Sequence, residues 1–337
     1  MGKIITGTPP GGERVRLAEV LPLATPLVIQ IFPAYLCNMR CKFCHFAIPH
    51  FNRRFISDRV FMSAGMYAKV IEDMKQFDGK VRVLRFVGMG EPLMHEHLIT
   101  MVNYAKLLEV ADRVEILTNA LLLDSYTTDG LLDAGLDRLV VSIQGTSPER
   151  YKEMSGVEIA FAKFLGQLEY FYERKGECNV HIKIIDCALT SPEDEQRYYH
   201  LFSPLCDTIG VERVGPIYGG VPMNDEMDTE AMTQFGVPAS EVKVCPQAFA
   251  TLQVNPDGKV VPCYSIEYPT FLGDVNDESI VDIWNGERLR EFRCRMLSGR
   301  GEASENCKNC QIIGHRMFPE DRLDDDTYRL KGVYGCL

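Results

Sequence analysis

The sequence predicts an α/β fold built on a parallel sheet, and two observations support this prediction. Between residues 27 and 214, short runs rich in valine, isoleucine and leucine alternate with longer segments whose apolar residues repeat at helical spacing. Each short run is almost continuously hydrophobic, as strands covered by helices on both faces are. Such alternation implies right-handed crossovers between parallel strands. Periodicity alone leaves a partial barrel and a doubly wound sheet as alternatives.

Six strands and five helices are expected in this region. The predicted strands are 27–32, 81–87, 113–117, 137–143, 179–187 and 208–214, and the predicted helices are 63–77, 97–108, 124–134, 159–175 and 192–205. Ser63 and Ser191 stand where helix N-caps are expected. Further along, Asn255-Pro256-Asp257-Gly258 predicts a turn that joins strands 248–254 and 259–262 into a hairpin, and 279–297 is expected to be one helix.

Composition excludes several classes of protein. The chain has 337 residues, enough for one large domain and a smaller one, and its 46% hydrophobic and 25% charged content is ordinary for a globular protein. No apolar run approaches the length of a membrane span, and the N-terminus lacks the apolar core of a secretory signal, so we expect a cytoplasmic protein that does not bind membranes. The net charge of −11, without a long basic run, argues against nucleic acid as a partner.

Cysteines carry the main functional signal. The chain has twelve, and Cys37, Cys41 and Cys44 follow the first predicted strand at C-x3-C-x2-C spacing. A loop at a strand end can curl three sulfurs around one inorganic centre. A structural zinc ion and a cubane iron–sulfur cluster each normally take four protein ligands. Three local thiolates therefore leave one metal position open to a ligand that is not protein. The alternative is a zinc knuckle completed by His45 or by a distant cysteine.

This loop resembles the signature of the radical S-adenosylmethionine (SAM) enzymes, in which an aromatic residue, here Phe43, precedes the third cysteine and lies against adenine. The resemblance implies a partial (β/α)6 TIM-like barrel and a 4Fe–4S cluster whose open iron binds SAM. It also implies that one electron, from a reducing partner such as flavodoxin or ferredoxin, splits SAM into methionine and a 5′-deoxyadenosyl radical. That radical abstracts a hydrogen atom from the substrate.

A second motif ends the second predicted strand. Gly88-Met89-Gly90-Glu91-Pro92 resembles the Gly-Gly-Glu-Pro motif that holds the SAM amino group in this family, with Met89 as a departure. A phosphate-binding loop would need a Gly-Lys-Ser/Thr ending, which is missing. At the next strand ends, Asn119 is a further candidate for SAM binding, and Ser142 and Gln144 resemble the family's ribose-contacting pair. The alternative for Ser142 is a buried hydroxyl bonded to backbone.

The C-terminal region carries a separate cysteine pattern. It resembles the SPASM/Twitch extension of radical SAM enzymes, which binds auxiliary 4Fe–4S clusters, and its ligands would be Cys245, Cys263, Cys307 and Cys310. A full SPASM domain continues with C-x5-C-x3-C, but Arg316 and Glu320 occupy those positions. We therefore expect the shorter Twitch form with one auxiliary cluster. Structural zinc remains the alternative for these four thiolates.

Three other cysteines lie near these patterns. Cys294 is expected to be a packed thiol and Cys336 part of a frayed terminus, although either is a possible replacement ligand. Cys187 falls at the end of the fifth predicted strand and is a candidate hydrogen donor to a substrate radical. The alternative for Cys187 is a small buried hydrophobic residue. Its neighbour Asp186 would point the opposite way along a strand.

The expected organisation has four parts: an N-terminal extension (1–25), the radical SAM barrel (26–218), a linker or lid (219–244) and a small hairpin-and-helix domain for the auxiliary cluster (245–337). The resemblance implies two-electron oxidation or epimerisation of a carbohydrate or aminocyclitol type of small molecule. A maturase that modifies a peptide or protein is the alternative, disfavoured because about 25 residues before the first strand are too few for a leader-binding module. Acidic residues in the linker and tail would suit a cationic substrate, although a solvated surface explains them equally well. A zinc-stabilised binding module is the alternative without catalysis.

Overall fold

A single curved sheet forms the centre of the computed structural model, which describes residues 1–5, 14–48, 57–215, 221, 232–264 and 268–337. Within these residues the sheet has ten strands in the order β1-β7-β6-β5-β4-β3-β2-β8-β9-β10. Pairing is parallel from β1 to β8 and antiparallel beyond it. The strands are β1 (Lys3–Ile4), β2 (Val28–Ile31), β3 (Val83–Phe86), β4 (Val114–Thr118), β5 (Arg138–Ile143), β6 (Asn179–Ile185), β7 (Thr208–Glu212), β8 (Thr251–Val254), β9 (Lys259–Val261) and β10 (Gly273–Asp274).

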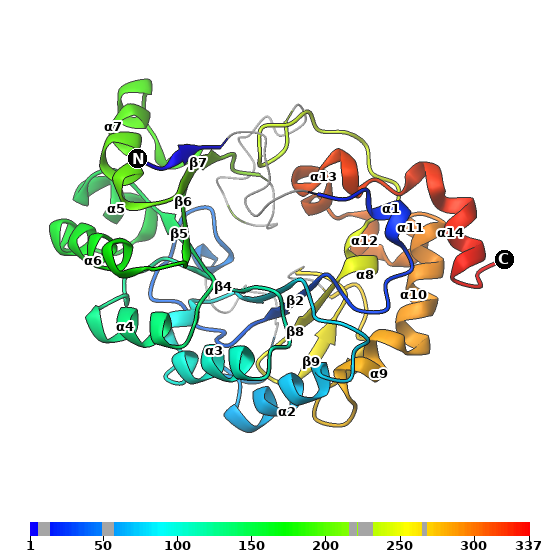
Figure 1. Cartoon of the computed structure of the whole chain (residues 1–337). Coiled ribbons are helices and arrows are strands. Elements are labelled where there is room, and N and C mark those ends of the chain that lie inside the picture. Colours follow the sequence, from blue (N-terminus) through cyan, green and yellow to red (C-terminus); the bar gives the residue numbers. More distant parts are fainter. Residues whose placement is uncertain (6–13, 49–56, 216–220, 222–231, 265–267) are drawn as a thin grey trace.

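Helices cover the outer face of this sheet and complete the ring (Figure 1). One set lies outside the strands: α2 (Ala64–Met74), α3 (Leu98–Leu107), α4 (Ser125–Asp133), α5 (Pro148–Ser155), α6 (Phe161–Arg174) and α7 (Pro192–Phe202). The others gather where the sheet leaves the ring open: α1 (Leu17–Val20), α8 (Gln247–Ala250), α9 (Ile280–Asn285), α10 (Glu287–Leu297), α11 (Arg300–Ala303), α12 (Glu305–Lys308), α13 (Ile312–Arg316) and α14 (Thr327–Val333). None of the described helices is long and apolar enough to cross a membrane.

The six predicted strands are present as β2 to β7, and the prediction of a partial α/β barrel is confirmed. Two expectations about helices are wrong. The segment 279–297 forms two helices rather than one, because the chain is extended at Gly286, where an added Cβ would lie 2.8 Å from the Asp282 carbonyl oxygen. Helix α5 was not anticipated, because its sequence is mostly polar and buries only Tyr151, Met154 and Ser155.

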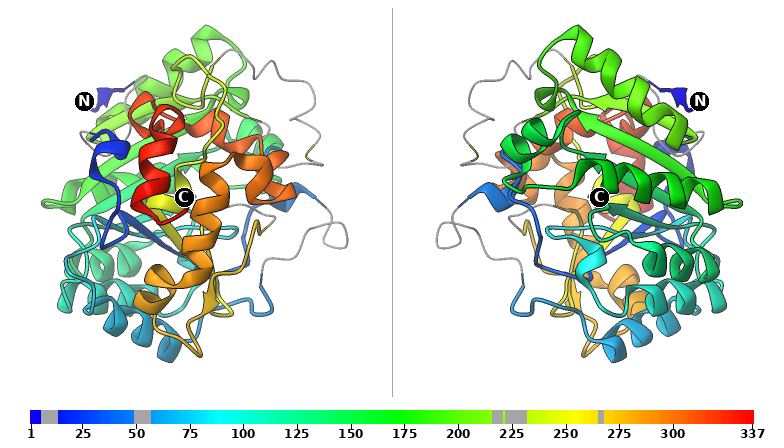
Figure 2. Two further views of the ribbon diagram at one scale, coloured as in Figure 1. Left: turned by 90° about the vertical axis from the view of Figure 1, so that its right-hand side faces the viewer. Right: turned by 90° about the vertical axis from the view of Figure 1, so that its left-hand side faces the viewer.

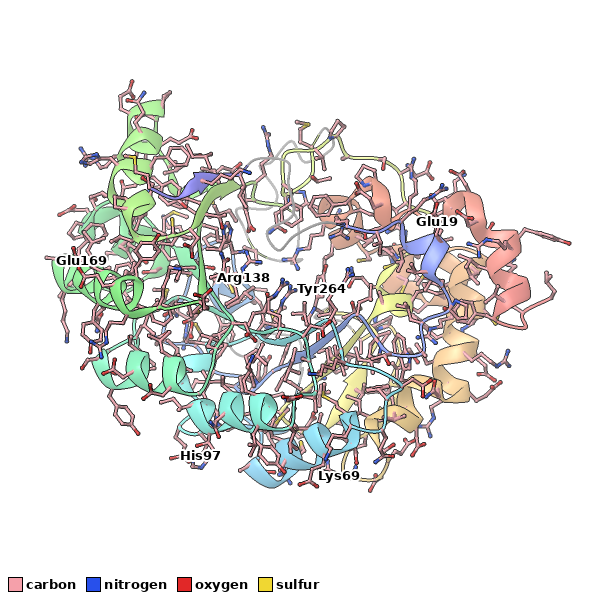
Figure 3. The ribbon with its side chains drawn as sticks, in the orientation of Figure 1. Glu19, Lys69, His97, Arg138, Glu169 and Tyr264 are labelled. Atoms are coloured by element: carbon pink, nitrogen blue, oxygen red, sulfur yellow. A yellow bond between two sulfur atoms is a disulfide. The ribbon has the colours of Figure 1, made fainter. Side chains whose placement is uncertain are left out.

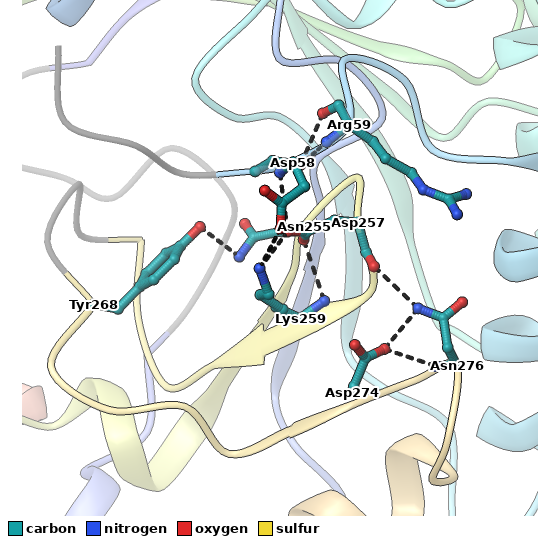
Figure 4. Close-up of polar contacts among 9 residues, drawn as sticks. Asp58, Arg59, Asn255, Asp257, Lys259, Tyr268, Asp274 and Asn276 are labelled. Atoms are coloured by element: carbon teal, nitrogen blue, oxygen red, sulfur yellow. Dashed lines mark hydrogen bonds and ion pairs between the residues drawn. The ribbon is translucent and has the colours of Figure 1, made fainter.

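The C-terminal hairpin belongs to the barrel sheet, which the sequence did not indicate. Strand β8 pairs in parallel with β2, so that Val28 to Ile31 lie opposite Thr251 to Val254. The hairpin turn is also tied to the segment before α2: Lys259 forms ion pairs with Asp58 (2.8 Å) and Asp257 (3.1 Å), and the Asp58 amide donates to Asp257 (Figure 4). The cysteine loop and the auxiliary region are therefore held by one framework.

The N-terminal extension also packs against the C-terminal part. Leu17, Ala18 and Leu21 are buried in a hydrophobic cluster with Phe249 and with residues of α10 and α14, whereas β1 pairs with β7. Figure 2 shows this C-terminal helical group gathered on the side of the molecule opposite α6 and α7. Of the predicted linker, residues 219, 220 and 222–231 lie outside the described part of the chain. The boundaries of the four predicted parts stay predictions.

Candidate active site

The cysteine loop lies directly after β2 and is fixed by the end of α5. The Arg40 amide donates to the Ser155 carbonyl (2.8 Å), and the Lys42 amide donates to the Met154 carbonyl (2.9 Å). Cys41 is buried, and Cys37 and Cys44 are half-buried. Helix α5, which the sequence did not predict, therefore helps to fix the conformation of the loop that carries the three predicted ligands.

The three thiols share one low-dielectric environment. Burial, with smaller contributions from the nearby charges of Glu91 and Cys44, raises the pKa of Cys37 to about 11, against the lowering effect of the Met39 amide. Burial also raises the pKa of Cys41 well above its usual value, with Cys44 and Cys37 contributing. Cationic iron would compensate thiolates at such a position. Within the described residues, no three His, Cys, Asp or Glu side chains converge as they would around a single metal ion, whereas a cubane takes each ligand on a separate iron atom.

The glycine-rich loop after β3 packs directly against the cysteine loop. A Cβ added to Gly88, whose φ is +143°, would lie 2.5 Å from the Phe32 ring, and one added to Gly90 would lie 2.1 Å from the Ala34 carbonyl oxygen. The Glu91 amide donates to the Leu36 carbonyl (2.8 Å). Glycine is required at both positions because a side chain would force the two loops apart. Met89 is buried beside Phe32 and Phe46.

Glu91 is fully buried at this junction. Its carboxylate accepts hydrogen bonds from the Leu93 amide (3.0 Å), the Asn119 amide (2.8 Å) and the Thr118 hydroxyl (2.5 Å). Burial raises its pKa to about 7, against the lowering effect of these bonds. Asn119 Nδ2 also donates to Asn38 Oδ1 (2.7 Å) in the cysteine loop. The structure thus brings Glu91 and Asn119 beside the three cysteines. Thr118 and Asn38 were not among the predicted site residues, although both adjoin one.

The other predicted SAM contacts lie nearby in the fold. Pro92 follows Glu91 as the first residue of a short 3-10 helix, and Phe43 packs against the main core. Ser142 is at the end of β5, and the Gln144 amide donates to the Ser142 carbonyl (3.2 Å). In the part of the chain that the structure describes, the buried Gln144 Oε1 has no hydrogen-bond partner. An orphaned acceptor fits a missing donor such as a ribose hydroxyl, so these residues fit SAM. Their individual roles stay predictions.

The end of the fifth predicted strand differs from expectation. Asp186–Ala188 forms a 3-10 turn rather than strand, so the expected alternation of Asp186 and Cys187 is wrong. Asp186 Oδ1 accepts from the amides of Cys187 (2.7 Å) and Val214 (2.9 Å), which ends β6 and ties it to the chain after β7. Burial, reinforced by the charge of Asp186, raises the pKa of the Cys187 thiol to about 12.

The four C-terminal cysteines line one pocket: Cys245, Cys263, Cys307 and Cys310. Ser304 caps α12 and accepts from the Cys307 amide (3.1 Å), and Arg300 donates to the Cys310 carbonyl (2.6 Å). Burial raises the pKa of Cys245 well above its usual value, and the charges of the other three thiolates add to this. Four cysteines around one pocket fit the ligand set of an auxiliary cluster.

Cys294 and Cys336 do not line this pocket. They form a disulfide across 42 residues of sequence. The expectation of a packed free thiol and a frayed end is therefore wrong. The C-terminal helix α14 packs against α10, which brings the end of the chain back to Cys294.

A large cavity open to solvent occupies the inside of the barrel, with a volume of about 790 Å³. At one end it is lined by Phe32, Gly88 and Met89 of the SAM site. At the other it reaches Gln247 and Tyr264, which also line the auxiliary cysteine pocket. Tyr264 points into the central opening, as does Arg138 (Figure 3). The cavity therefore connects the two cysteine sites.

Comparison with known proteins agrees with this geometry. The family model of the Radical SAM superfamily matches residues 31–186, and that of an iron–sulfur cluster-binding domain, SPASM, matches residues 245–311. The chain therefore carries a radical SAM domain followed by an iron–sulfur cluster-binding domain. The matches cover the cysteine loop, strands β3 to β6 and the four C-terminal cysteines. These two domains imply that the protein binds SAM, a 4Fe–4S cluster and an auxiliary iron–sulfur cluster, so the predicted cofactors are confirmed.

Individual relatives share the fold and part of the sequence. A probable GTP 3′,8-cyclase of Methanococcus maripaludis is 33% identical over 119 residues, which are 35% of this chain and 37% of that protein, so the match spans about a third of the curated relative. SuiB of Streptococcus suis bound to precursor peptide SuiA has a TM-score of 0.62 at 17% identity, covering 89% of this chain and 72% of that one. BtrN in complex with AdoMet and 2-DOIA has a TM-score of 0.53 at 18% identity, and the match covers 85% of this chain and 92% of that one.

Proposed function

We propose that this radical SAM protein oxidises a small molecule held in the barrel cavity by two electrons. One electron leaves with the hydrogen atom that the 5′-deoxyadenosyl radical abstracts, and the other passes to the auxiliary cluster while the substrate loses a proton to the solvent in the open cavity. The observation that supports this most directly is the continuity of the cavity from Gly88 and Met89 to Gln247 and Tyr264. A substrate there would lie between the site of hydrogen abstraction and the four cysteines that would hold the electron-accepting cluster.

The chain's own residues would prepare this chemistry. When bound, the cluster of the cysteine loop and SAM supply a 5′-deoxyadenosyl radical to the substrate. Cys37, Cys41 and Cys44 would hold that cluster, and the glycine-rich loop and Glu91 would position SAM. Phe32, Phe46 and Met89 pack together beside this junction. Cys245, Cys263, Cys307 and Cys310 hold the acceptor. The reducing partner is expected to be a flavodoxin or ferredoxin.

Oxidation is favoured over epimerisation by the position of Cys187. An epimerase needs a hydrogen donor that reaches the substrate radical, but Cys187 is not among the residues that line the cavity. The raised pKa keeps the Cys187 sulfur protonated, as a hydrogen donor must be. Its position outside the cavity lining nevertheless favours oxidation, because the thiol would not contact a substrate held there. The named substrates of relatives, a nucleotide and a peptide, differ from each other. A cavity of this size inside the barrel favours a small molecule, and a peptide or protein side chain is the second candidate.

Anaerobic reconstitution with iron and sulfide tests this proposal. The wild-type protein should bind about eight irons per chain and, after reduction, convert SAM to 5′-deoxyadenosine. Replacing Cys37, Cys41 and Cys44 together by alanine should abolish 5′-deoxyadenosine formation. Cys307→Ala with Cys310→Ala should remove about four irons and leave some uncoupled SAM cleavage.

Cys178→Ala is the matched control, because Cys178 is a buried free thiol of the main core outside both sites, and it should retain full iron content and cleavage. Colourless protein that holds zinc at both sites would refute the proposal and favour a binding module. Once a substrate is known, full product formation without Cys307 and Cys310 would refute the electron-acceptor role.

A further inference from the structure

Three arginines surround one carboxylate inside the barrel. Arg85 of β3, Glu115 of β4 and Arg138 of β5 are partners in the strand register. Arg113 precedes Glu115 by two positions and lies on the same face of the sheet. All four side chains line the cavity. Radical SAM chemistry as described above uses none of them.

The charges of this group do not balance. Glu115 is buried, and its two oxygens pair with Arg85 and with Arg113, the latter at 3.1 Å. Burial raises the pKa of Glu115, but the charges of the three arginines outweigh this effect and hold the pKa below its usual value. Three guanidinium groups against one carboxylate leave a surplus of two positive charges, in a chain whose net charge is −11.

Arg138 carries the unsatisfied part of this surplus. It is 4% exposed, and among the described residues its Nε has no hydrogen-bond partner. Burial, with the charges of Arg113 and Arg85, lowers its pKa to about 10, and Glu115 opposes this, so the group stays protonated at neutral pH. An uncompensated buried cation is costly, and a structural ion-pair network would be expected to provide its partner.

Within the part of the chain that the structure describes, neighbouring charges do not supply a partner for Arg138. Lys183 and Glu212 form their own pair (2.6 Å), and Asp137 pairs with Lys106 (2.7 Å). Asp112 also lines the cavity but is exposed. Among the described residues, the Arg138 guanidinium therefore faces the cavity without a carboxylate of its own.

We propose that Arg85, Arg113 and Arg138 bind an oxyanion of the substrate, a phosphate or a carboxylate. The planar fork of donors on each guanidinium matches the oxygens of both groups. Glu115 lies three residues before the end of β4, which places this site about 10 Å along the strands from the level of the SAM loop. The substrate would thus extend from an anionic end among the arginines to a reacting carbon near SAM. This inference rests on the proposed function and replaces the expectation of a cationic substrate.

Anion binding to the reconstituted protein tests the inference, with inorganic phosphate and acetate as separate probes in calorimetric and thermal-unfolding titrations. Phosphate or acetate should bind to the wild-type protein and raise its unfolding temperature. The probe that binds more tightly identifies the class of oxyanion. Arg138→Gln should weaken that binding about tenfold or more, as expected for loss of a charged hydrogen-bond donor.

Arg174→Gln is the matched control, since Arg174 is an exposed arginine of α6 that pairs with Asp129, and it should bind the probe like the wild type. Glu115→Gln supplies a test with the opposite sign. Removing the only carboxylate in the group should tighten anion binding several-fold and make stability depend on the anion. If the arginines have a purely structural role, Glu115→Gln should be less stable than the wild type, and added phosphate or acetate should not restore its stability.

The inference is overturned if neither probe binds to the wild-type protein in the millimolar range, or if Arg138→Gln binds it unchanged. The same wild-type samples are assayed for reductive SAM cleavage. Cleavage without anion binding would refute this inference alone, whereas anion binding without cleavage would refute the proposed function.

Discussion

Glu91 shows how a single side chain depends on what surrounds it. Its carboxylate accepts three hydrogen bonds, yet burial still raises its pKa from 4.5 to about 7. The folded protein therefore retains a proton on Glu91 over a pH range in which the unfolded chain has released it. A cationic group of a bound ligand would relieve this cost, which fits a residue expected to hold the SAM amino group.

The stability of the protein without SAM should accordingly depend on pH through Glu91. The raised pKa contributes stability that is complete below pH 4.5 and is lost as the pH rises to about 7, about 3 kcal/mol in total. Between pH 5 and 8, the free energy of unfolding of the wild-type protein should fall by about this amount relative to that of Glu91→Gln, as measured by denaturant unfolding. Glu96→Gln, at an exposed carboxylate nearby, should follow the wild-type pH dependence. Parallel pH profiles for wild type and Glu91→Gln would contradict this reading.

Among the elements, the short helix α12 positions two ligands of the auxiliary site. Ser304 caps it through the Cys307 amide, and the loss of such a cap costs about 1 kcal/mol. Ser304→Ala should therefore release iron from the auxiliary cluster faster on chelator challenge, measured as iron lost per chain over time. The first cluster should be unaffected.

Ser63→Ala is the control, because Ser63 caps α2 through the Met66 amide in the same way but lies outside both cysteine sites. It should lower stability by a similar amount without changing the rate of iron release. Equal rates of release in the two variants would mean that the cap does not position Cys307.

Local sequence signals predicted elements with strong periodicity and missed those without it. The six strands β2 to β7 were found because each is a continuous apolar run. Helix α5 was missed because three of its eight residues are buried and the rest are polar. The strand was predicted to continue through Asp186 and Cys187, where the structure has a 3-10 turn, because apolar residues resume after Asp186. What ends the strand is the hydrogen bond from the Val214 amide to Asp186, which no local pattern records.

For the molecule as a whole, the pairing of β8 with β2 joins the barrel and the auxiliary region into one sheet. The two parts should therefore unfold together. The chain has one tryptophan, Trp284, which is buried in α9 and donates to the Leu23 carbonyl (3.2 Å). Its fluorescence reports on the C-terminal part, whereas ellipticity reports on all helices. The two thermal transitions should coincide, and a fluorescence change that precedes the ellipticity change would show independent domains.

Cysteine spacing and strand-end motifs revealed the chemistry of this protein, because ligands that serve one centre from a single loop must be close in sequence. Cys37, Cys41 and Cys44 are such a set, and the fold class followed from equally local periodicity. Contacts between strands and helices that are far apart in the chain leave no local pattern in the sequence. The register of β3, β4 and β5 brings Arg85, Arg113 and Arg138 around Glu115, and the packing of α14 on α10 joins Cys294 to Cys336. These pairings depend on how whole elements pack, so only the tertiary structure decided them.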